Sequence, residues 1–220
     1  MSPLLKLIHT RTPKFYFMNK VMKNRDFTLL DLGAGNGSPS RTTALFPKCT
    51  YHGLDLDYSY NYSPGDIAAI AKFYEADLSQ SPLSEIPDNS CDYINMAHII
   101  EHLPNGEEVI ARIAPKLREG GFIYIEYPGA RSTRLPSMPG SLNFYDDPTH
   151  VRVYSVAVLA QALEQSGFAV IASGTRRSWF HILTMPARAV HYLLRDRKVY
   201  GSVFWDMLGF AEYVFARKVS

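Results

Sequence analysis

The stretch that decides the fold is Leu29-Leu30-Asp31-Leu32-Gly33-Ala34-Gly35-Asn36-Gly37. A short apolar run over residues 27–32 leads directly into a glycine-rich turn, as is typical of a buried parallel strand. Ser38 and Pro39 then suit the cap and the first position of a helix that reaches about Phe46. These residues predict one strand–turn–helix unit.

Strands and helices alternate along the rest of the chain. Further strands are predicted over 50–56, 73–76, 91–96, 122–126, 168–172 and 210–216, and helices begin at Ser63-Pro64, at Glu107 (reaching Leu117) and at Ser155. The expected fold is α/β: a Rossmann-like, doubly wound, seven-stranded and mostly parallel sheet, with helices on both faces and the last strand antiparallel. We expect a single domain over 1–220.

Three segments interrupt this alternation. Residues 1–26 are expected to form an N-terminal helical segment, and 176–208 to supply one or two basic amphipathic helices before the last strand. Residues 127–154 form a long stretch that is largely without periodicity. Loops of this length inside compact domains are usually functional or mobile, so substrate contacts are expected there.

Composition excludes several classes of function. The 23 Lys and Arg residues nearly balance the 21 Asp and Glu residues and are spread along the chain, so a nucleic-acid partner is not indicated. Cys49 and Cys91 are isolated and form no disulfide framework or zinc pattern. Neither a signal peptide nor a membrane span is indicated, so a cytoplasmic protein is expected. A monomer and a homodimer both remain open.

The glycine turn predicts a ligand site. Gly33, Gly35 and Gly37 allow a tight turn and a close approach of the backbone to a ligand, and the next helix adds free amide groups. A dinucleotide fingerprint would place its third glycine at position 38, which is Ser38. Asp55, about 20 residues on, suits the ribose hydroxyls of NAD and of S-adenosylmethionine (SAM) alike.

Five short motifs in order carry a family resemblance. The glycine turn, Gly53-Leu54-Asp55-Leu56-Asp57 and Ala76-Asp77-Leu78 resemble the first three motifs of the class I SAM-dependent methyltransferases. The segments 92–104 and 119–126 resemble the fourth and fifth strands of that family and the turn between them. The resemblance covers roughly residues 27 to 173.

The resemblance implies a cofactor site for SAM. In it the glycine turn would cradle the amino acid end, Asp55 with Leu56 would meet the ribose, Asp77 with Leu78 would flank the adenine, and Asn95 and Met96 would border the methionine portion. A pocket edged by Asp31, Asp55 and Asp77 suits the positive charges of SAM, whereas it would repel the diphosphate of NAD. His102 recurs near the cofactor in the family, and a packed structural histidine is an equal alternative.

The acceptor side is expected in the segment 143–155. His150 is the candidate general base, with Asp146 or Asp147 orienting its ring. Further candidates for substrate binding are Arg131, Arg134, Tyr145 and Arg152. The alternative is that His150 and Arg152 only pin the loop to the backbone.

A magnesium ion held by Asp146, Asp147 and His150 is an alternative, but no metal site is expected. The Asp-Pro-Thr-His run over 147–150 resembles a segment of methyltransferases that act on sugars, lipid head groups and related small molecules.

The sequence therefore predicts a SAM-dependent methyltransferase for a small polar acceptor, with O-methylation of a sugar or glycan precursor as the first hypothesis. One alternative is a methyltransferase for a lipid or quinone head group, with peripheral membrane contact through 176–208. Another is a SAM-binding partner protein without catalysis. A dehydrogenase is disfavoured by the glycine spacing.

Overall fold

The computed structural model describes residues 10–35, 37–57 and 62–219. Residues 1–9 of the expected N-terminal segment and Asn36 of the glycine turn lie outside the described residues. The elements are α2 (Pro13–Met22), β1 (Phe27–Leu32), α3 (Ser38–Leu45), β2 (Cys49–Asp55), α4 (Pro64–Ala69), β3 (Lys72–Glu75), β4 (Cys91–Ala97), η1 (Ile100–His102), α5 (Gly106–Ile113), η2 (Ala114–Lys116), β5 (Leu117–Pro128), η3 (Ala130–Arg134), η4 (Phe144–Asp146), α6 (Val156–Gln165), β6 (Phe168–Thr175), α7 (Trp179–Asp196), η5 (Gly201–Val203), α8 (Trp205–Leu208) and β7 (Ala211–Lys218).

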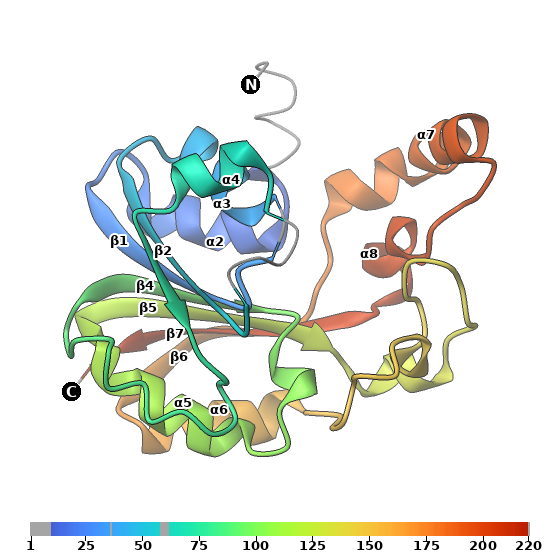
Figure 1. Ribbon diagram of the computed structural model, residues 1–220. Coiled ribbons are helices and arrows are strands. Elements are labelled where there is room, and N and C mark those ends of the chain that lie inside the picture. Colours follow the sequence, from blue (N-terminus) through green and yellow to red (C-terminus); the bar gives the residue numbers. More distant parts are fainter. Residues whose placement is uncertain (1–9, 36, 58–61, 220) are drawn as a thin grey trace.

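The strands form one seven-stranded sheet in the order β3-β2-β1-β4-β5-β7-β6. All neighbouring pairs are parallel except those of β7, which runs antiparallel to β5 and to β6. Helices α2, α3 and α4 cover one face, and α5 and α6 cover the other (Figure 1). The expected fold class is confirmed.

Each face of the sheet has its own apolar core. Alternate residues of β1 point to opposite faces, so Leu29 packs with α2 and α3, whereas Leu30 and Leu32 pack with α5 and α6. All three leucines are fully buried. This explains why β1 is a continuous apolar run and not an alternating one.

Helix α5 ends earlier than the sequence predicts. Pro115 has no N–H with which to continue the helix, so the chain passes through η2, and Leu117 already belongs to β5. Strand β5 then runs on to Pro128, two residues into the stretch expected as loop, and the rest of that stretch contains η3 and η4.

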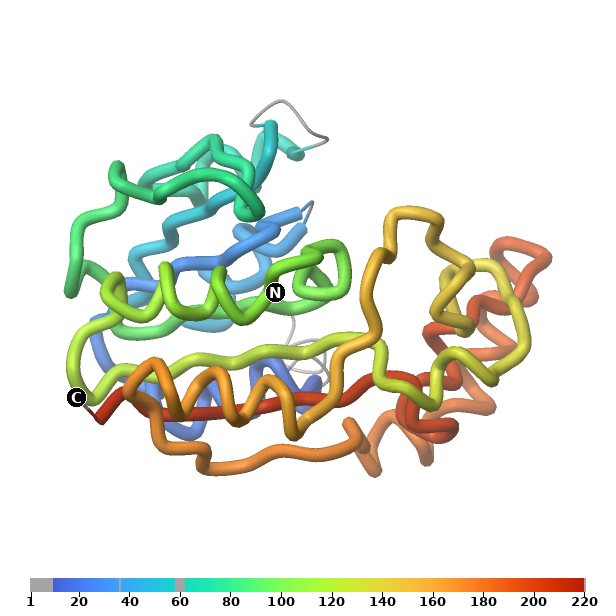
Figure 2. The backbone as a smooth tube through the Cα atoms, turned by 90° about the horizontal axis from the view of Figure 1, so that it is seen from below, coloured from blue at the N-terminus to red at the C-terminus, as the bar shows by residue number. Residues whose placement is uncertain are grey.

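The stretch after β5 and the helices after β6 lie together beyond the carboxyl end of β5 (Figure 2). A small cluster of Leu142, Phe210 and Ala211 joins them, and Trp205 Nε1 donates to the carbonyl of Ser141 at 2.6 Å. Within this group, helix α7 lies over α8 (Figure 1). Among the described helices, none has the length and apolar character needed to cross a membrane.

Candidate active site

The glycine turn lies between the carboxyl end of β1 and the first turn of α3. Gly33 has φ +67°, and a Cβ atom there would lie 2.9 Å from Cδ1 of Ile99, so both conformation and space require glycine. Gly37 has φ +76° and immediately precedes α3. The glycines that the sequence analysis named are therefore needed for the shape of the turn. At Gly33 the backbone is not covered by a side chain of its own.

Asp66 holds this turn from the neighbouring helix α4, a role that the sequence analysis missed. Its fully buried carboxylate accepts hydrogen bonds from Gly37 N, from Ser40 N and Oγ, and from Ser63 N and Oγ, at 2.6–3.2 Å. Burial alone would raise the pKa of Asp66, but these hydrogen bonds outweigh it and hold the pKa well below its usual range. The signal in the sequence was Ser63-x-x-Asp66, which resembles a capping box.

A cavity of about 270 Å³ opens beside the turn. Five residues predicted to bind the cofactor line it: Gly33, Asp55, Leu56, Asp77 and Leu78. The remaining lining residues are Leu54, Ala76, Ser79, Ile99, His102, Leu103 and Pro104. The ends of β1, β2 and β3 therefore converge on one cavity, as expected at the carboxyl edge of a parallel sheet.

The two strand-end carboxylates of this cavity have different surroundings. Asp55 Oδ1 accepts from Leu56 N at 2.8 Å, and its Oδ2 lies 3.4 Å from Gly35 N. Asp77 accepts hydrogen bonds from the hydroxyl and backbone N–H of Ser79, which lower its pKa. Part of the Asp77 carboxylate is thus committed to its own turn.

Asp31 and Asn95 lie buried beneath the turn. Asp31 accepts from Tyr51 Oη at 2.5 Å, from Ser38 Oγ at 2.6 Å and from Asn95 Nδ2. Its further contact is Lys14 Nζ at 3.3 Å. Through these partners, Asp31 links the end of β1 to the start of α3 and to β4. Met96 is fully buried in the core, so its side chain is turned away from solvent.

These residues fit SAM. The turn leaves room at Gly33 for close backbone contact, and Asp55 presents a carboxylate to the cavity. The Oδ1 atom of Asn95 is buried and accepts no hydrogen bond from the described residues, so it is an acceptor in need of a donor. The ammonium of an amino acid moiety is a donor of that kind.

His150 lies close to the cofactor cavity through its neighbour His102. The two rings are 4.8 Å apart between centroids, and His102 lines the cavity. His150 Nδ1 lies 2.6 Å from the carbonyl of Phe144. Because a carbonyl only accepts, Nδ1 carries the hydrogen, and in the neutral ring Nε2 keeps its lone pair.

The two carboxylates expected to orient His150 accept hydrogen bonds from other groups. Asp146 caps its own loop, accepting from the backbone N–H of Met138, Leu142 and Asn143. One oxygen of Asp147 accepts from Thr149, and its other oxygen is 3.9 Å from His150 Nε2. The Phe144 carbonyl, not a carboxylate, makes the short contact with the ring.

The four substrate-binding candidates do not gather around the cavity. Arg152 forms a bidentate ion pair with Glu107 of α5, at 2.5 and 2.7 Å. Arg131 and Arg134 lie exposed on η3, and Tyr145 is 71% exposed. Their assignment as substrate ligands remains a prediction.

A buried charged network, absent from the sequence analysis, lies at the end of β4 and β5. Glu126 accepts from Arg176 at 2.7 Å and lies 3.1 Å from His98 Nε2, while Arg176 also pairs with Asp206 at 2.8 Å. Trp205 stacks beside His98, with ring centroids 5.0 Å apart. Arg176 lies 50 residues after Glu126 and 30 residues before Asp206, so sequence patterns did not reveal this network.

The fold and the cavity together define a class I methyltransferase. The comparison with protein families agrees: a family described as a methyltransferase domain matches residues 6–173. The chain therefore belongs to this methyltransferase domain family, and the expected SAM-dependent methyltransferase is confirmed.

Solved structures share the fold. A SAM-dependent methyltransferase from Mesorhizobium loti matches with a TM-score of 0.63 and 16% identity, over 93% of this chain and 97% of that one. One from Archaeoglobus fulgidus gives 0.58 and 21%, over 98% and 93%. Phosphoethanolamine N-methyltransferase 2 from Haemonchus contortus, in complex with SAM, gives 0.63 and 17%, over 94% and 52%.

Two curated relatives match part of the chain. A sterol 24-C-methyltransferase of Neurospora crassa is 30% identical over 112 residues, which is 48% of this chain and 29% of the relative. Phosphoethanolamine N-methyltransferase 2 of Caenorhabditis elegans is 31% identical over 111 residues, 46% and 24%. The chain thus spans less than a third of the length of either relative.

Proposed function

We propose that this methyltransferase methylates a hydroxyl group of a small polar acceptor, such as a sugar or glycan precursor, held between the cofactor cavity and the segment 127–154. The observation that carries the proposal is the tautomer of His150, that is, which ring nitrogen carries the hydrogen. Its Nδ1 is committed to the Phe144 carbonyl, so Nε2 keeps its lone pair, and the ring packs against His102, which lines the cavity.

Bound SAM supplies an electrophilic methyl group on a sulfonium. Transfer to a hydroxyl breaks the carbon–sulfur bond, forms a carbon–oxygen bond and releases the hydroxyl proton. The chain must therefore hold the acceptor oxygen in line and remove that proton. His150 Nε2 is the proposed proton acceptor, and the glycine turn, Asp55, Asp77 and Asn95 are the proposed contacts of the cofactor.

The test is His150→Ala with turnover and cofactor binding measured in parallel. We expect turnover to fall by about 10² or more, with the affinity for S-adenosylhomocysteine nearly unchanged. His191→Ala, which removes an exposed histidine of α7, is the matched control and should have wild-type turnover. Normal turnover of His150→Ala would contradict the assignment.

A second candidate function is methylation of a lipid or quinone head group at a membrane surface. Specific support comes from α7, where Trp179, Leu183 and Leu194 are 73%, 77% and 69% exposed on one side of the helix. The two curated relatives act on a sterol and on phosphoethanolamine, by their names.

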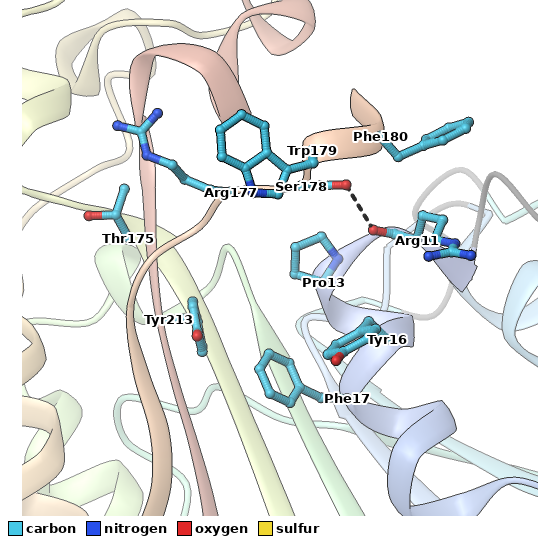
Figure 3. Close-up of a pocket in the computed structure, with 10 residues that line it drawn as sticks. All are labelled: Arg11, Pro13, Tyr16, Phe17, Thr175, Arg177, Ser178, Trp179, Phe180 and Tyr213. Atoms are coloured by element: carbon cyan, nitrogen blue, oxygen red, sulfur yellow. Dashed lines mark hydrogen bonds between the residues drawn. The ribbon is translucent and has the colours of Figure 1, made fainter. Parts of the chain in front are cut away.

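A second cavity, of about 370 Å³, lies at the root of α7 (Figure 3). Its walls carry Phe17, Trp179 and Tyr213, with Arg11 and Arg177 among the lining residues. Ser178 Oγ donates to the carbonyl of Arg11 at 3.1 Å, which joins the start of α7 to the chain just before α2. Aromatic walls with arginines suit an apolar group that carries an anionic head, which is the chemistry of the second candidate.

A further inference from the structure

Glu101 is a buried carboxylate that faces a histidine on each of two sides. Its side chain is 1% exposed, and neither carboxylate oxygen accepts a hydrogen bond from the described residues. Its nearest nitrogen atoms are His98 Nδ1 at 3.3 Å and His150 Nε2 at 3.9 Å, and no Lys or Arg of the described chain forms an ion pair with it. A buried carboxylate is costly unless positive charge compensates it. His98, whose pKa Glu101 and Glu126 raise against the effect of burial, supplies one such charge and shares it between the two carboxylates.

Two histidines besides His98 lie close to this carboxylate. His150 Nδ1 is bound to the Phe144 carbonyl, and His102 Nδ1 lies 3.1 Å from the carbonyl of Thr149. Both Nδ1 atoms therefore carry hydrogen, and both Nε2 atoms are available as ligands in the neutral rings. Histidine ligands of metals almost always donate their second N–H in this way, which fixes the tautomer and the ring orientation.

The three side chains are within reach of one ion. One ligand atom from each of Glu101, His102 and His150 can be chosen so that all lie within 4.8 Å of one another. The backbone holds them in place, since Val151 N and Arg152 N donate to the Glu101 carbonyl at 2.9 and 3.2 Å. The segment after His150 is thereby fastened to the turn that carries Glu101 and His102.

We infer that Glu101, His102 and His150 form a binding site for one divalent transition-metal ion, such as Zn²⁺ or Mn²⁺. Two imidazole nitrogens and one carboxylate are ligands that such ions accept, with coordination positions left open for oxygen atoms. Asp147, whose second oxygen is 3.9 Å from His150 Nε2, lies close enough to assist.

The catalytic consequence rests on the proposed function. An acceptor hydroxyl bound to the ion would have a lowered pKa and lose its proton to water before methyl transfer. With the ion bound, His150 acts as a ligand, so this inference keeps the O-methylation of the proposed function and replaces His150 as its proton acceptor. His102 lines the cofactor cavity, so an oxygen held at this site would lie next to the cofactor.

The first test is binding, which needs no acceptor. Protein stripped with EDTA is titrated with Zn²⁺ in a calorimeter and, separately, with Co²⁺ while visible absorption is recorded. We expect one high-affinity site and Co²⁺ ligand-field bands. Glu101→Gln and His150→Gln should each weaken binding at least tenfold, while His191→Gln should not. The proposed site is refuted if the wild type binds no metal. It is also refuted if both variants fold and bind the metal as tightly as the wild type. If a variant fails to fold, the Co²⁺ spectrum of the wild type alone decides, because ligand-field bands report nitrogen and oxygen ligands.

The second test separates the site from the proposed function. With an accepted substrate, stripping should abolish methyl transfer while S-adenosylhomocysteine binding persists, and Zn²⁺ or Mn²⁺ should restore transfer. Full turnover without metal would overturn the catalytic role and leave His150 as the base. Metal binding in a protein that methylates no acceptor oxygen would support the site and refute the proposed function.

Discussion

At the scale of single residues, the geometry of the cofactor turn depends on Asp66. Asp66→Asn keeps the size of the side chain but loses the charge that accepts hydrogen bonds from Gly37, Ser40 and Ser63. We expect a loss of about 2–4 kcal/mol in the free energy of unfolding at pH 7, measured by urea denaturation. A loss below about 0.5 kcal/mol would show that Asp66 does not hold the turn.

The stabilisation by Asp66 also has a defined pH dependence. Because the folded pKa lies below the unfolded value of 3.8, the stabilisation is complete above that value and is lost as the pH falls toward the folded pKa. The difference in unfolding free energy between wild type and Asp66→Asn should therefore stay constant from pH 5 to 7 and narrow below about pH 4. A difference that is independent of pH would contradict this.

The residue scale also shows what the sequence could predict. Asp55 and Asp77 were found because each lies at or just beyond the end of a strand, and the ends of parallel strands meet at one edge. Asn95 was named through the family resemblance, and it lies inside β4. Glu101 was missed as a ligand because it resembled part of a family motif, and its partner His150 lies 49 residues further on. The magnesium site considered from the sequence included Asp146, but in the structure this carboxylate caps its own loop.

At the scale of elements, Arg176 joins β5, the end of β6 and α8. It contacts Glu126 and Asp206 and is 8% exposed, so Arg176→Met would remove the guanidinium that two buried carboxylates share and would leave Glu126 with His98 as its nearby cation. We expect a loss of about 3–5 kcal/mol in unfolding free energy and faster proteolysis within 129–154 and 177–208. Arg195→Met is the control, because its ion pair with Asp196 is at the surface, and it should leave stability and proteolysis unchanged.

Elements with a strong local signal were predicted well, and those set by distant contacts were not. The limits of β1 follow from its apolar run and the glycine turn, and the start of α6 follows from Ser155, whose hydroxyl accepts from Val158 N. The end of α5 was misplaced because its apolar spacing continues to Leu117, although Pro115 interrupts it and pairing with Cys91 draws Leu117 into the sheet. Local periodicity could not reveal that pairing.

At the scale of the whole molecule, helix α7 turns its apolar side to solvent and its polar side toward the rest of the protein. His181, Arg188 and Tyr192 lie on one side and are at least partly covered, whereas the side with Trp179, Leu183 and Leu194 faces solvent. Basic residues flank this apolar side at both ends, Arg177 before the helix and Arg197 with Lys198 after it. An apolar strip with basic ends is the pattern of a helix that rests on an anionic lipid surface.

The second candidate function therefore predicts binding to anionic vesicles. At low salt, the protein should float with vesicles of phosphatidylglycerol and phosphatidylcholine, and raised salt should release part of it because the basic ends are screened. Trp179→Ser combined with Leu183→Ser should lower the partition coefficient about tenfold or more, since each side chain contributes about 1.5–3 kcal/mol when buried. Ile171→Ser, which changes an exposed aliphatic residue of β6, is the matched control and should float like the wild type.

Two outcomes would contradict the membrane candidate: the wild type stays at the bottom of the gradient at low salt, or the α7 double variant floats as well as the wild type. In either case the membrane surface is not where this enzyme works, and the soluble polar acceptor remains.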